Sequence, residues 1–215
     1  MKTFIQLPLG LSYRKAFGRS NFIVAPCNRE AVSWIDKWPA WPFPAVLIYG
    51  APGSGKTHLA SIFSDYRIDA AQLKNDFEPF FQKKIVIENL NRLNNEEALF
   101  HLFNFVRDSG GGLLMTAEKI PTFHLPDLQS RMMAVPKAAI GLPDEDFILS
   151  VFKQAWDDRH IVVDPAVLTY AVRHMDRTFK TIQDVVQTAD ELSLATGRKI
   201  TIPVIKETLE RIKEA

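Results

Sequence analysis

The chain has 215 residues, of which 47% are hydrophobic and 24% charged, as in an ordinary globular protein. Its formal charge of +1 excludes a global attraction to nucleic acid, so DNA contact would need a local basic patch. One cysteine, Cys27, excludes an internal disulfide and a cysteine-based zinc cluster. The start lacks the apolar core of a signal peptide, and no apolar run approaches the ~20 residues that span a bilayer. We therefore expect a cytoplasmic protein with no membrane partner.

The first part of the chain leads from a tail into a buried strand. Residues 1–20 show weak periodicity and are predicted to be an N-terminal tail, and residues 21–24 a short extended segment. Asn28 is placed to cap a helix that continues to Ile35, and prolines 39, 42 and 44 end that helix. The tryptophans at 34, 38 and 41 are expected to cover an edge of the sheet. The apolar run 45–49 has the character of a buried strand.

A phosphate-binding loop follows that strand. Residues 50–57 fit the pattern G-x-x-x-x-G-K-[ST], and residues 57–63 look like the helix that should follow. In such a loop, backbone N–H groups at a helix N-terminus surround the phosphates. Lys56 would reach the β- and γ-phosphates, and the Thr57 hydroxyl would hold Mg²⁺. The predicted nucleotide-contacting residues are Gly50, Ala51, Pro52, Gly53, Ser54, Gly55, Lys56 and Thr57.

Strands and helices alternate in the next part of the chain. Strands are predicted near 67–71 and at 84–87, 113–116 and 137–140, with a helix at 96–107 that glycines 110–112 end. After Pro143, helices are predicted at 144–159, 165–174, 178–196 and 203–213, with Asp164 among the capping residues. This order predicts an α/β domain with a central parallel sheet at 21–142 and a small all-α domain at 143–215.

The strand at 84–87 ends in Glu88 and Asn89. In a nucleotide hydrolase, acidic residues at the end of a second strand hold Mg²⁺ and activate water. Glu88 is therefore a candidate metal ligand beside Thr57, and the alternative is a carboxylate that only ends a strand at the surface. Asn89 is neutral and cannot act as a general base, so we expect poor hydrolysis of the chain's own nucleotide.

Together these motifs resemble the Hda/DnaA-like AAA+ family of bacterial replication-initiation proteins, over nearly the whole chain. Segment 21–29 is similar to the family segment that borders adenine, 50–57 to Walker A and 87–90 to Walker B. Segment 115–121 resembles the sensor 1 strand, and 175–181 falls at sensor 2. The ending at 198–207 is similar to Hda and stops without the helix-turn-helix domain of the full initiator, which favours an Hda-like regulator. The expected fold is an AAA+ α/β domain followed by a helical lid.

The resemblance implies nucleotide contacts that spacing alone does not assign. Ile23 and Val24 would border the adenine, and Thr116 would act as sensor 1. His58 directly follows the loop and is counted among the nucleotide-binding residues, although a place in the helix explains it equally well. Lys180 is the nearest match to the sensor 2 arginine, and Arg177 is the alternative.

Arg131 lies in segment 125–131, which resembles the family's arginine-finger segment. The resemblance implies that Arg131 acts in trans, on ATP held by a partner. A finger of this kind stabilises transition-state charge on the γ-phosphate and contributes roughly 10³–10⁵ in rate. The alternative is a surface arginine that caps a helix or pairs with Asp127.

The N-terminal tail contains a short peptide, residues 6–11, similar to those that dock replication proteins on the β sliding clamp of DNA polymerase III. Gln6 would make polar contacts, and Leu7, Leu9 and Leu11 would fill an apolar pocket. A leader that packs its leucines onto the domain is the alternative.

The function implied by the resemblance is regulation of replication initiation. The chain would bind ADP or ATP with Mg²⁺, dock on the clamp, and promote hydrolysis of ATP bound to DnaA. Contact with DNA would be indirect, and a homo-oligomer is possible. The competing interpretations are an autonomous AAA+ ATPase or helicase loader, and a non-catalytic adaptor for which nucleotide is only a structural support.

Overall fold

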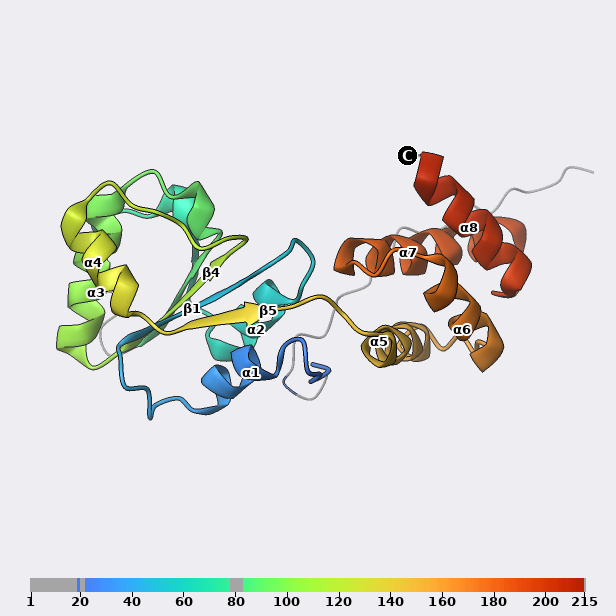
Figure 1. The fold of residues 1–215 in the computed structure, drawn as a ribbon, viewed down its shortest axis with the longest axis horizontal. Helices are drawn as coiled ribbons and strands as arrows, with labels where there is room; N and C mark the ends of the chain where they lie inside the picture. The colour runs from blue at the N-terminus through green and yellow to red at the C-terminus, as the bar shows by residue number, and fades with distance from the viewer. Residues whose placement is uncertain (1–18, 20–21, 78–82, 215) are drawn as a thin grey trace, which may run out of the picture. The chain divides into compact units, whose positions relative to one another are not determined.

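The computed structural model describes residue 19, residues 22–77 and residues 83–214, which form two compact units (Figure 1). The first unit ends at Asp144 and has an α/β fold, and the second begins at Glu145 and contains four helices, α5 to α8. Residues 6–11, with the predicted clamp-binding peptide, lie outside the described residues. No helix within the described ranges is long and apolar enough to cross a membrane.

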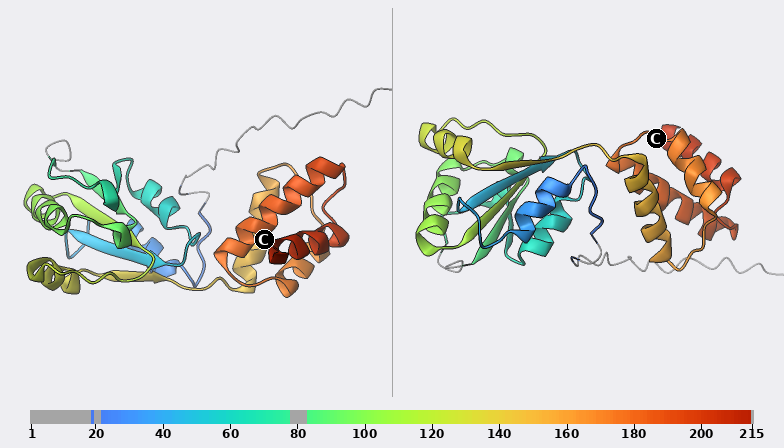
Figure 2. Two further views of the ribbon diagram at one scale, coloured as in Figure 1. Left: turned by 90° about the horizontal axis from the view of Figure 1, so that it is seen from above. Right: turned by 60° about the horizontal axis from the view of Figure 1, so that its bottom comes forward.

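The α/β unit is built on a five-stranded parallel sheet, which confirms the predicted fold class (Figure 2). The strands lie in the order β2-β3-β4-β1-β5. Their bounds are β1 (Ala45–Gly50), β2 (Arg67–Asp69), β3 (Lys84–Glu88), β4 (Gly112–Ala117) and β5 (Lys137–Ile140). In a parallel sheet all carboxyl ends meet at one edge, which is where α/β proteins bind their ligands. The end of β1, Glu88 and the end of β4 are therefore neighbours.

Helices cover both faces of the sheet (Figure 1). Helices α1 (Arg29–Asp36) and α2 (Lys56–Phe63) pack on one face, and α3 (Glu96–Ser109) and α4 (Pro126–Ala134) cover the other. Short 3₁₀ turns follow β2 at Ala70–Gln72 and β3 at Leu90–Arg92. Coverage on both faces explains why the central strands are almost uninterrupted apolar runs. The core beneath α3 contains Leu47, Ile85, Ile87, Leu113, Met115, Leu99, Leu102, Phe103 and Val106.

The predicted capping role of Asn28 is wrong. Asn28 directly precedes α1, but its side chain makes no capping hydrogen bond to the helix. The Oδ1 atom instead accepts a bond from the Ala25 N–H at 2.9 Å, and Nδ2 donates to the Ile23 carbonyl at 2.9 Å. An amide has both a donor and an acceptor, and here the loop before the helix occupies both.

The tryptophan cluster reaches the first residue of a central strand. A Cβ atom added to Gly112, the first residue of β4, would lie 2.5 Å from the Trp38 ring. Trp38 also packs edge-to-face on Phe63 of α2, with ring centroids 5.8 Å apart, and Trp41 stacks on Phe63 at 5.1 Å. Since β4 lies between β3 and β1, the rings close the amino-terminal end of the sheet's centre.

The helical unit contains α5 (Glu145–Asp157), α6 (Pro165–His174), α7 (Phe179–Thr196) and α8 (Ile202–Glu214). Asp164 caps α6 by accepting from the Ala166 N–H at 2.8 Å, as predicted. Thr178 caps α7 by accepting from the Thr181 N–H at 3.0 Å. Each cap satisfies a backbone donor that the first turn of a helix leaves unpaired. The core between these helices includes Ile148, Phe152, Trp156, Leu168, Ile182, Val185, Ala189 and Ile205.

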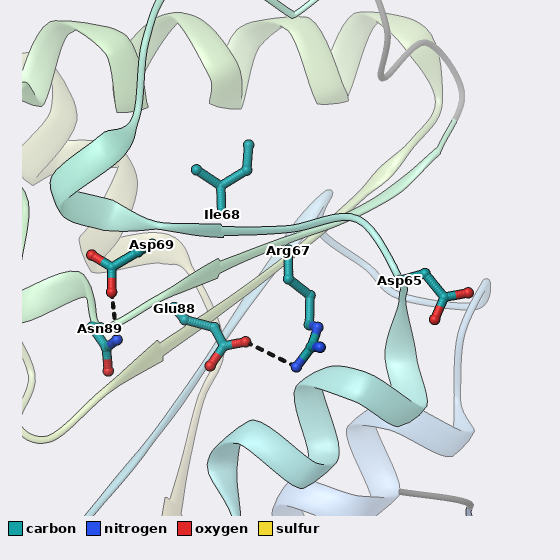
Figure 3. A pocket seen from close by; sticks show the side chains of 6 residues that line it. All are labelled: Asp65, Arg67, Ile68, Asp69, Glu88 and Asn89. Atoms are coloured by element: carbon teal, nitrogen blue, oxygen red, sulfur yellow. Dashed lines mark hydrogen bonds and ion pairs between the residues drawn. The ribbon is translucent and has the colours of Figure 1, made fainter.

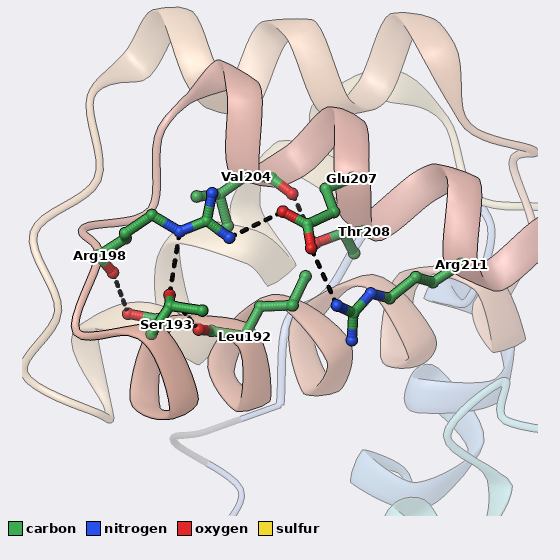
Figure 4. A network of polar contacts seen from close by, with 8 residues as sticks. Leu192, Ser193, Arg198, Val204, Glu207, Thr208 and Arg211 are labelled. Atoms are coloured by element: carbon green, nitrogen blue, oxygen red, sulfur yellow. Dashed lines mark hydrogen bonds and ion pairs between the residues drawn. The ribbon is translucent and has the colours of Figure 1, made fainter. Parts of the chain in front are cut away.

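A polar network fixes the turn between α7 and α8 (Figure 4). Glu207 accepts from Arg198 at 2.7 Å and from Arg211 at 2.9 Å. The Ser193 hydroxyl donates to the carbonyl of Arg198 at 2.7 Å. The two arginines lower the pKa of Glu207, with the Arg198 hydrogen bond as the largest cause. The Arg198–Glu207 segment, which resembles Hda in sequence, therefore has a structural role in holding two lid helices together.

Candidate functional site

The phosphate-binding loop joins β1 to α2 at the edge where the strands end. Gly53 and Gly55 have φ angles of 76° and 91°, which side chains with a Cβ rarely adopt. A Cβ on Gly50 would lie 2.8 Å from the carbonyl oxygen of Ile140 on the neighbouring strand β5. The Ser54 N–H closes the turn by donating to the Ala51 carbonyl at 3.2 Å. Glycine at these positions lets the chain curl tightly into the N-terminus of α2, where anions bind.

Lys56 folds back onto the loop that carries it. Its Nζ donates to the carbonyls of Gly50 at 2.7 Å and Ala51 at 2.8 Å, and to the Ser54 hydroxyl at 3.4 Å. Burial lowers the pKa of Lys56, and the negative charge of Glu118 partly offsets that effect. The ammonium is thus anchored inside the phosphate loop by neutral oxygens, which phosphate oxygens can replace.

The two predicted magnesium ligands lie side by side, although they are far apart in sequence. Thr57 Oγ1 donates to Glu88 Oε2 at 3.0 Å. The other oxygen of this carboxylate, Oε1, accepts from Arg67 Nη1 at 3.4 Å (Figure 3). Sequence reasoning missed Arg67, because nothing in a three-residue strand indicated which way its side chain points.

Asn89 directs its amide to a second carboxylate (Figure 3). Its Nδ2 donates to Asp69 Oδ2 at 2.7 Å, and its backbone is left-handed, with φ of 58°. Asp69 also accepts from the Ala71 N–H at 3.0 Å and pairs with Arg92 at 3.5 Å. The hydrogen bond from Asn89 is the largest cause that lowers the pKa of Asp69. The side chain that replaces a possible general base therefore acts as a donor to Asp69.

Thr116 and Glu118 end β4 in different ways. Thr116 is buried, and its hydroxyl oxygen accepts from the Asn89 N–H at 3.3 Å, so it connects β4 to the end of β3. Glu118, one residue beyond the strand, is the acidic charge that acts on Lys56. Sequence analysis assigned no role to Glu118. The sequence feature that could have indicated Glu118 is the one that indicated Glu88, an acidic residue at the end of a buried apolar strand.

The segment before α1, residues 22–25, borders the loop through an aromatic ring. Phe22 packs edge-to-face on His58, with centroids 5.0 Å apart, and a Cβ on Gly55 would lie 3.3 Å from the Phe22 ring. The predicted adenine neighbours Ile23 and Val24 follow, and Val24 is 45% exposed. The Cys27 carbonyl accepts from the Gly141 N–H at 2.8 Å, which ties this part of the chain to the segment after β5.

Helix α4 carries Arg131 and is fixed at both ends by side chains from other elements. Glu96 of α3 accepts from the N–H groups of His124 at 3.0 Å and Leu125 at 2.7 Å, just before α4 begins. At the other end, Lys137 donates to the carbonyls of Met132, Met133 and Val135 at 2.8, 3.2 and 2.9 Å. These contacts hold the helix in one position on α3.

The Arg131 guanidinium lies over two aromatic rings of α3. Its centre is 4.7 Å from the Phe100 centroid and 5.7 Å from the Phe103 centroid. Over residues 22–77 and 83–214, no carboxylate forms an ion pair with it, Asp127 included. The alternative of a pair with Asp127 therefore does not describe this arginine, which lies in the last turn of α4.

The two sensor 2 candidates differ in their surroundings within the helical unit. Arg177 forms an ion pair with Glu145 at the start of α5. Lys180 lies in the first turn of α7 and is exposed, and the described residues contain no ion pair to it. Lys180 is therefore the cation of this segment that is not engaged with a carboxylate of its own unit.

The residues at the strand ends fit phosphate groups and a divalent cation. The loop has the curled backbone and the half-buried ammonium of a phosphate site. Thr57 and Glu88 supply the oxygen donors that Mg²⁺ prefers, and this ion is usually held by one or two carboxylates together with substrate phosphates. A bound nucleotide would supply the phosphates, and these side chains would orient them.

A family model matches the helical unit of the chain. Residues 144–209 match the family model described as "Hda, lid domain". An uncharacterized protein of Haemophilus influenzae is 29% identical, over 95% of this chain and 98% of its own length. The DnaA initiator of Flavobacterium psychrophilum is 22% identical over 89% of this chain. The chain is thus similar to the Hda/DnaA-like AAA+ family, over most of its length. It spans about half the length of the DnaA relatives it matches (48% for the Flavobacterium protein).

Solved DnaA structures share the fold of this Hda/DnaA-like protein. Domain III of Thermotoga maritima DnaA superposes with a TM-score of 0.76 at 20% identity, covering 92% of this chain and 97% of that domain. DnaA from Aquifex aeolicus bound to AMPPCP has a TM-score of 0.71 at 18% identity, covering 94% of this chain and 69% of the other. The predicted AAA+ domain with a helical lid is thereby confirmed.

Proposed function

We propose that this protein is an Hda-like regulator that binds an adenine nucleotide and promotes hydrolysis of ATP held by DnaA. Its relation to replication initiation follows from the family. We further propose that Arg131 is an arginine finger, that the chain contacts the clamp, and that it carries ADP or ATP. The observation that carries the proposal is the Arg131 guanidinium, which is held on α3 rings without a carboxylate partner among the described residues.

Nucleotide binding is supported by the loop and by the relatives. The positions of Lys56, Thr57 and Glu88 suit a diphosphate with Mg²⁺, and an Aquifex relative binds AMPPCP. We propose ADP or ATP as the ligand, with Ile23 and Val24 at the adenine and Lys180 at the phosphates. The Asn89 side chain has no acidic group that could take a proton from water. We therefore expect the protein to hydrolyse its own nucleotide slowly.

Arg131 would act on the partner's nucleotide. Because the ends of α4 are held by Glu96 and Lys137, the helix can present the guanidinium without first having to order itself. Stacking on an aromatic ring contributes only about 0.5–1 kcal/mol at an exposed site. A γ-phosphate in its transition state is a far stronger partner. We therefore propose that docking on DnaA moves the guanidinium from the rings to the phosphate.

The test is single-turnover hydrolysis of radiolabelled ATP on DnaA, with clamp and DNA present. Arg131→Ala should reduce the stimulated rate by roughly 10³–10⁵, down to the intrinsic rate of DnaA, while ADP binding by the variant stays intact. Arg107→Ala is the matched control, because Arg107 is a surface arginine of the same domain whose one ion pair among the described residues is with its neighbour Asp108, at 2.9 Å. Stimulation that survives in Arg131→Ala would refute the finger.

Clamp docking is tested separately. We propose that Gln6, Leu7, Leu9 and Leu11 bind the sliding clamp and bring the protein to DNA indirectly. The double variant Gln6→Ala/Leu9→Ala should lose retention on immobilised clamp and keep ADP affinity. If the double variant is fully retained on the clamp, the tail does not dock there and serves only the fold.

The turnover assay also distinguishes the competing functions. An autonomous ATPase or helicase loader would hydrolyse its own ATP without DnaA, and the Asn89 bond to Asp69 argues against it. A non-catalytic adaptor would bind DnaA or the clamp and leave the hydrolysis rate unchanged. The proposed regulator accelerates hydrolysis only when DnaA carries the ATP.

A further inference from the structure

The carboxylate expected to hold Mg²⁺ already has a cation. Glu88 Oε1 accepts from Arg67 Nη1 at 3.4 Å, and Oε2 accepts from the Thr57 hydroxyl at 3.0 Å. Both oxygens of the carboxylate therefore have donors from the chain itself. The Glu88 side chain is 15% exposed, against 37% for Arg67, so the pair is more than a loose surface contact.

The sheet register explains why Arg67 reaches this carboxylate. β2 pairs in parallel with β3, with Asp69 opposite Glu88 and Arg67 opposite Val86. Arg67 and Asp69 are two residues apart and share a face of the strand, so Arg67 is the diagonal neighbour of Glu88. Like charges directly opposite each other are destabilising. Each carboxylate instead turns to its own donor, Glu88 to Arg67 and Asp69 to Asn89.

We propose that Arg67 is an internal substitute for Mg²⁺, and that this protein binds adenine nucleotide almost independently of the metal. A guanidinium beside Glu88 neutralises the charge that would attract the ion, and it repels a second cation at the same carboxylate. Mg²⁺ must displace Arg67 before Glu88 can hold it. Lys56, which only neutral oxygens hold, remains available to the phosphates.

The surroundings let Arg67 respond to the nucleotide. A cavity of about 360 Å³ borders it, lined by Asp65, Arg67, Ile68, Asp69, Glu88 and Asn89 (Figure 3). The guanidinium therefore borders open space as well as Glu88. The side chain thereby adds positive charge on the phosphate side of β3 that sequence analysis did not count.

This inference rests on the proposed nucleotide site. The experiment is fluorescence titration of the full chain with mant-ADP, in excess MgCl₂ and in excess EDTA. We expect the wild-type dissociation constant to change less than about threefold between the two conditions. Arg67→Gln should bind mant-ADP at least tenfold more tightly in Mg²⁺ than in EDTA, because Glu88 is then free for the metal. Arg67→Lys, which keeps the charge, should resemble the wild type.

Arg92→Gln is the matched control, since it removes one positive charge from a residue that pairs with Asp69, at 3.5 Å, and not with Glu88. It should keep the wild-type insensitivity to EDTA. Two results would overturn the inference and leave the nucleotide site standing. One is a wild-type affinity that falls tenfold or more in EDTA. The other is an Arg67→Gln variant whose ratio of dissociation constants in EDTA and Mg²⁺ equals that of the wild type. Absence of mant-ADP binding by the wild type in both conditions would overturn the nucleotide site as well. Urea unfolding of each variant confirms that the compared chains are folded.

Discussion

Replacing Asn89 by aspartate restores an acidic pair after β3, and we expect this substitution to destabilise the protein. The Asn89 amide donates to Asp69 Oδ2 at 2.7 Å. A carboxylate in its place loses the donor and faces the Asp69 carboxylate. The left-handed backbone at this position is not the cause, because aspartate tolerates it nearly as well as asparagine.

The cost has two parts. A hydrogen bond to a charged group contributes about 1.5–3 kcal/mol, and we take the lower end because the Asp69 side chain is 27% exposed. Two carboxylates about 4 Å apart repel by ~1 kcal/mol in water and ~4 kcal/mol at the effective dielectric of a protein surface. Arg92 offsets part of this repulsion. We expect a loss of about 2–4 kcal/mol at pH 7 and low salt.

The pH dependence has a definite sign. In the wild type the pKa of Asp69 is lowered, first by the Asn89 hydrogen bond and then by the Ala71 N–H. The stability that this contributes is present above the unfolded pKa of about 3.9 and is lost as the pH falls through the lower folded pKa. In Asn89→Asp, the facing carboxylates raise one pKa of the pair. The stability difference between variant and wild type should therefore be largest near neutral pH and shrink as the pH falls toward 4.

Urea unfolding at pH 7 and pH 4.5 measures these differences. The double variant Asp69→Asn/Asn89→Asp exchanges the donor and the acceptor, so it should recover most of the loss and show a favourable coupling energy. The reasoning is refuted if Asn89→Asp is as stable as the wild type at pH 7, or if the double variant is no more stable than the single one.

Other substitutions test separate parts of the structure. Gly112→Ala places a Cβ 2.5 Å from the Trp38 ring and should lower the free energy of unfolding by about 1–3 kcal/mol. The tryptophan emission spectrum should change as well. An unchanged urea midpoint would contradict the packing of Trp38 on Gly112. Thr178→Ala removes the cap on α7 and should cost about 1 kcal/mol, whereas Thr178→Ser should keep most of the stability; equal losses would show that the hydroxyl is not the cause. Lys56→Met should abolish mant-ADP binding in titration without unfolding the chain, and affinity within threefold of the wild type would exclude the loop as the phosphate site.

The fold was predictable wherever a local pattern determined it. The run 45–49 is apolar throughout because helices cover both faces of β1, and Asp164 directly precedes the helix it caps. Helix α4 was described from sequence only as the segment that bears Arg131. Its buried positions are few (Leu128 and Met132), and its ends are fixed by residues distant in sequence. A helix stabilised mainly by long-range contacts leaves a weak local pattern.

The same distinction applies to the site. The loop glycines, Lys56, Thr57 and Glu88 were recognisable because their spacing repeats in many phosphate-binding proteins. The bond from Arg67 to Glu88 crosses between strands, and strand pairing cannot be derived from spacing. The capping role assigned to Asn28 failed for a related reason, since its amide bonds backward to Ile23 and Ala25 instead of forward into α1.

That backward bond has a mechanical consequence. Asn28 holds the main chain at Ile23 and Ala25, and the carbonyl of its neighbour Cys27 accepts from the Gly141 N–H, three residues before the α/β unit ends at Asp144. The segment that borders the phosphate loop and the segment that follows β5 thus share one brace, made of backbone and a single amide. Loss of that amide should loosen both segments of the α/β unit together.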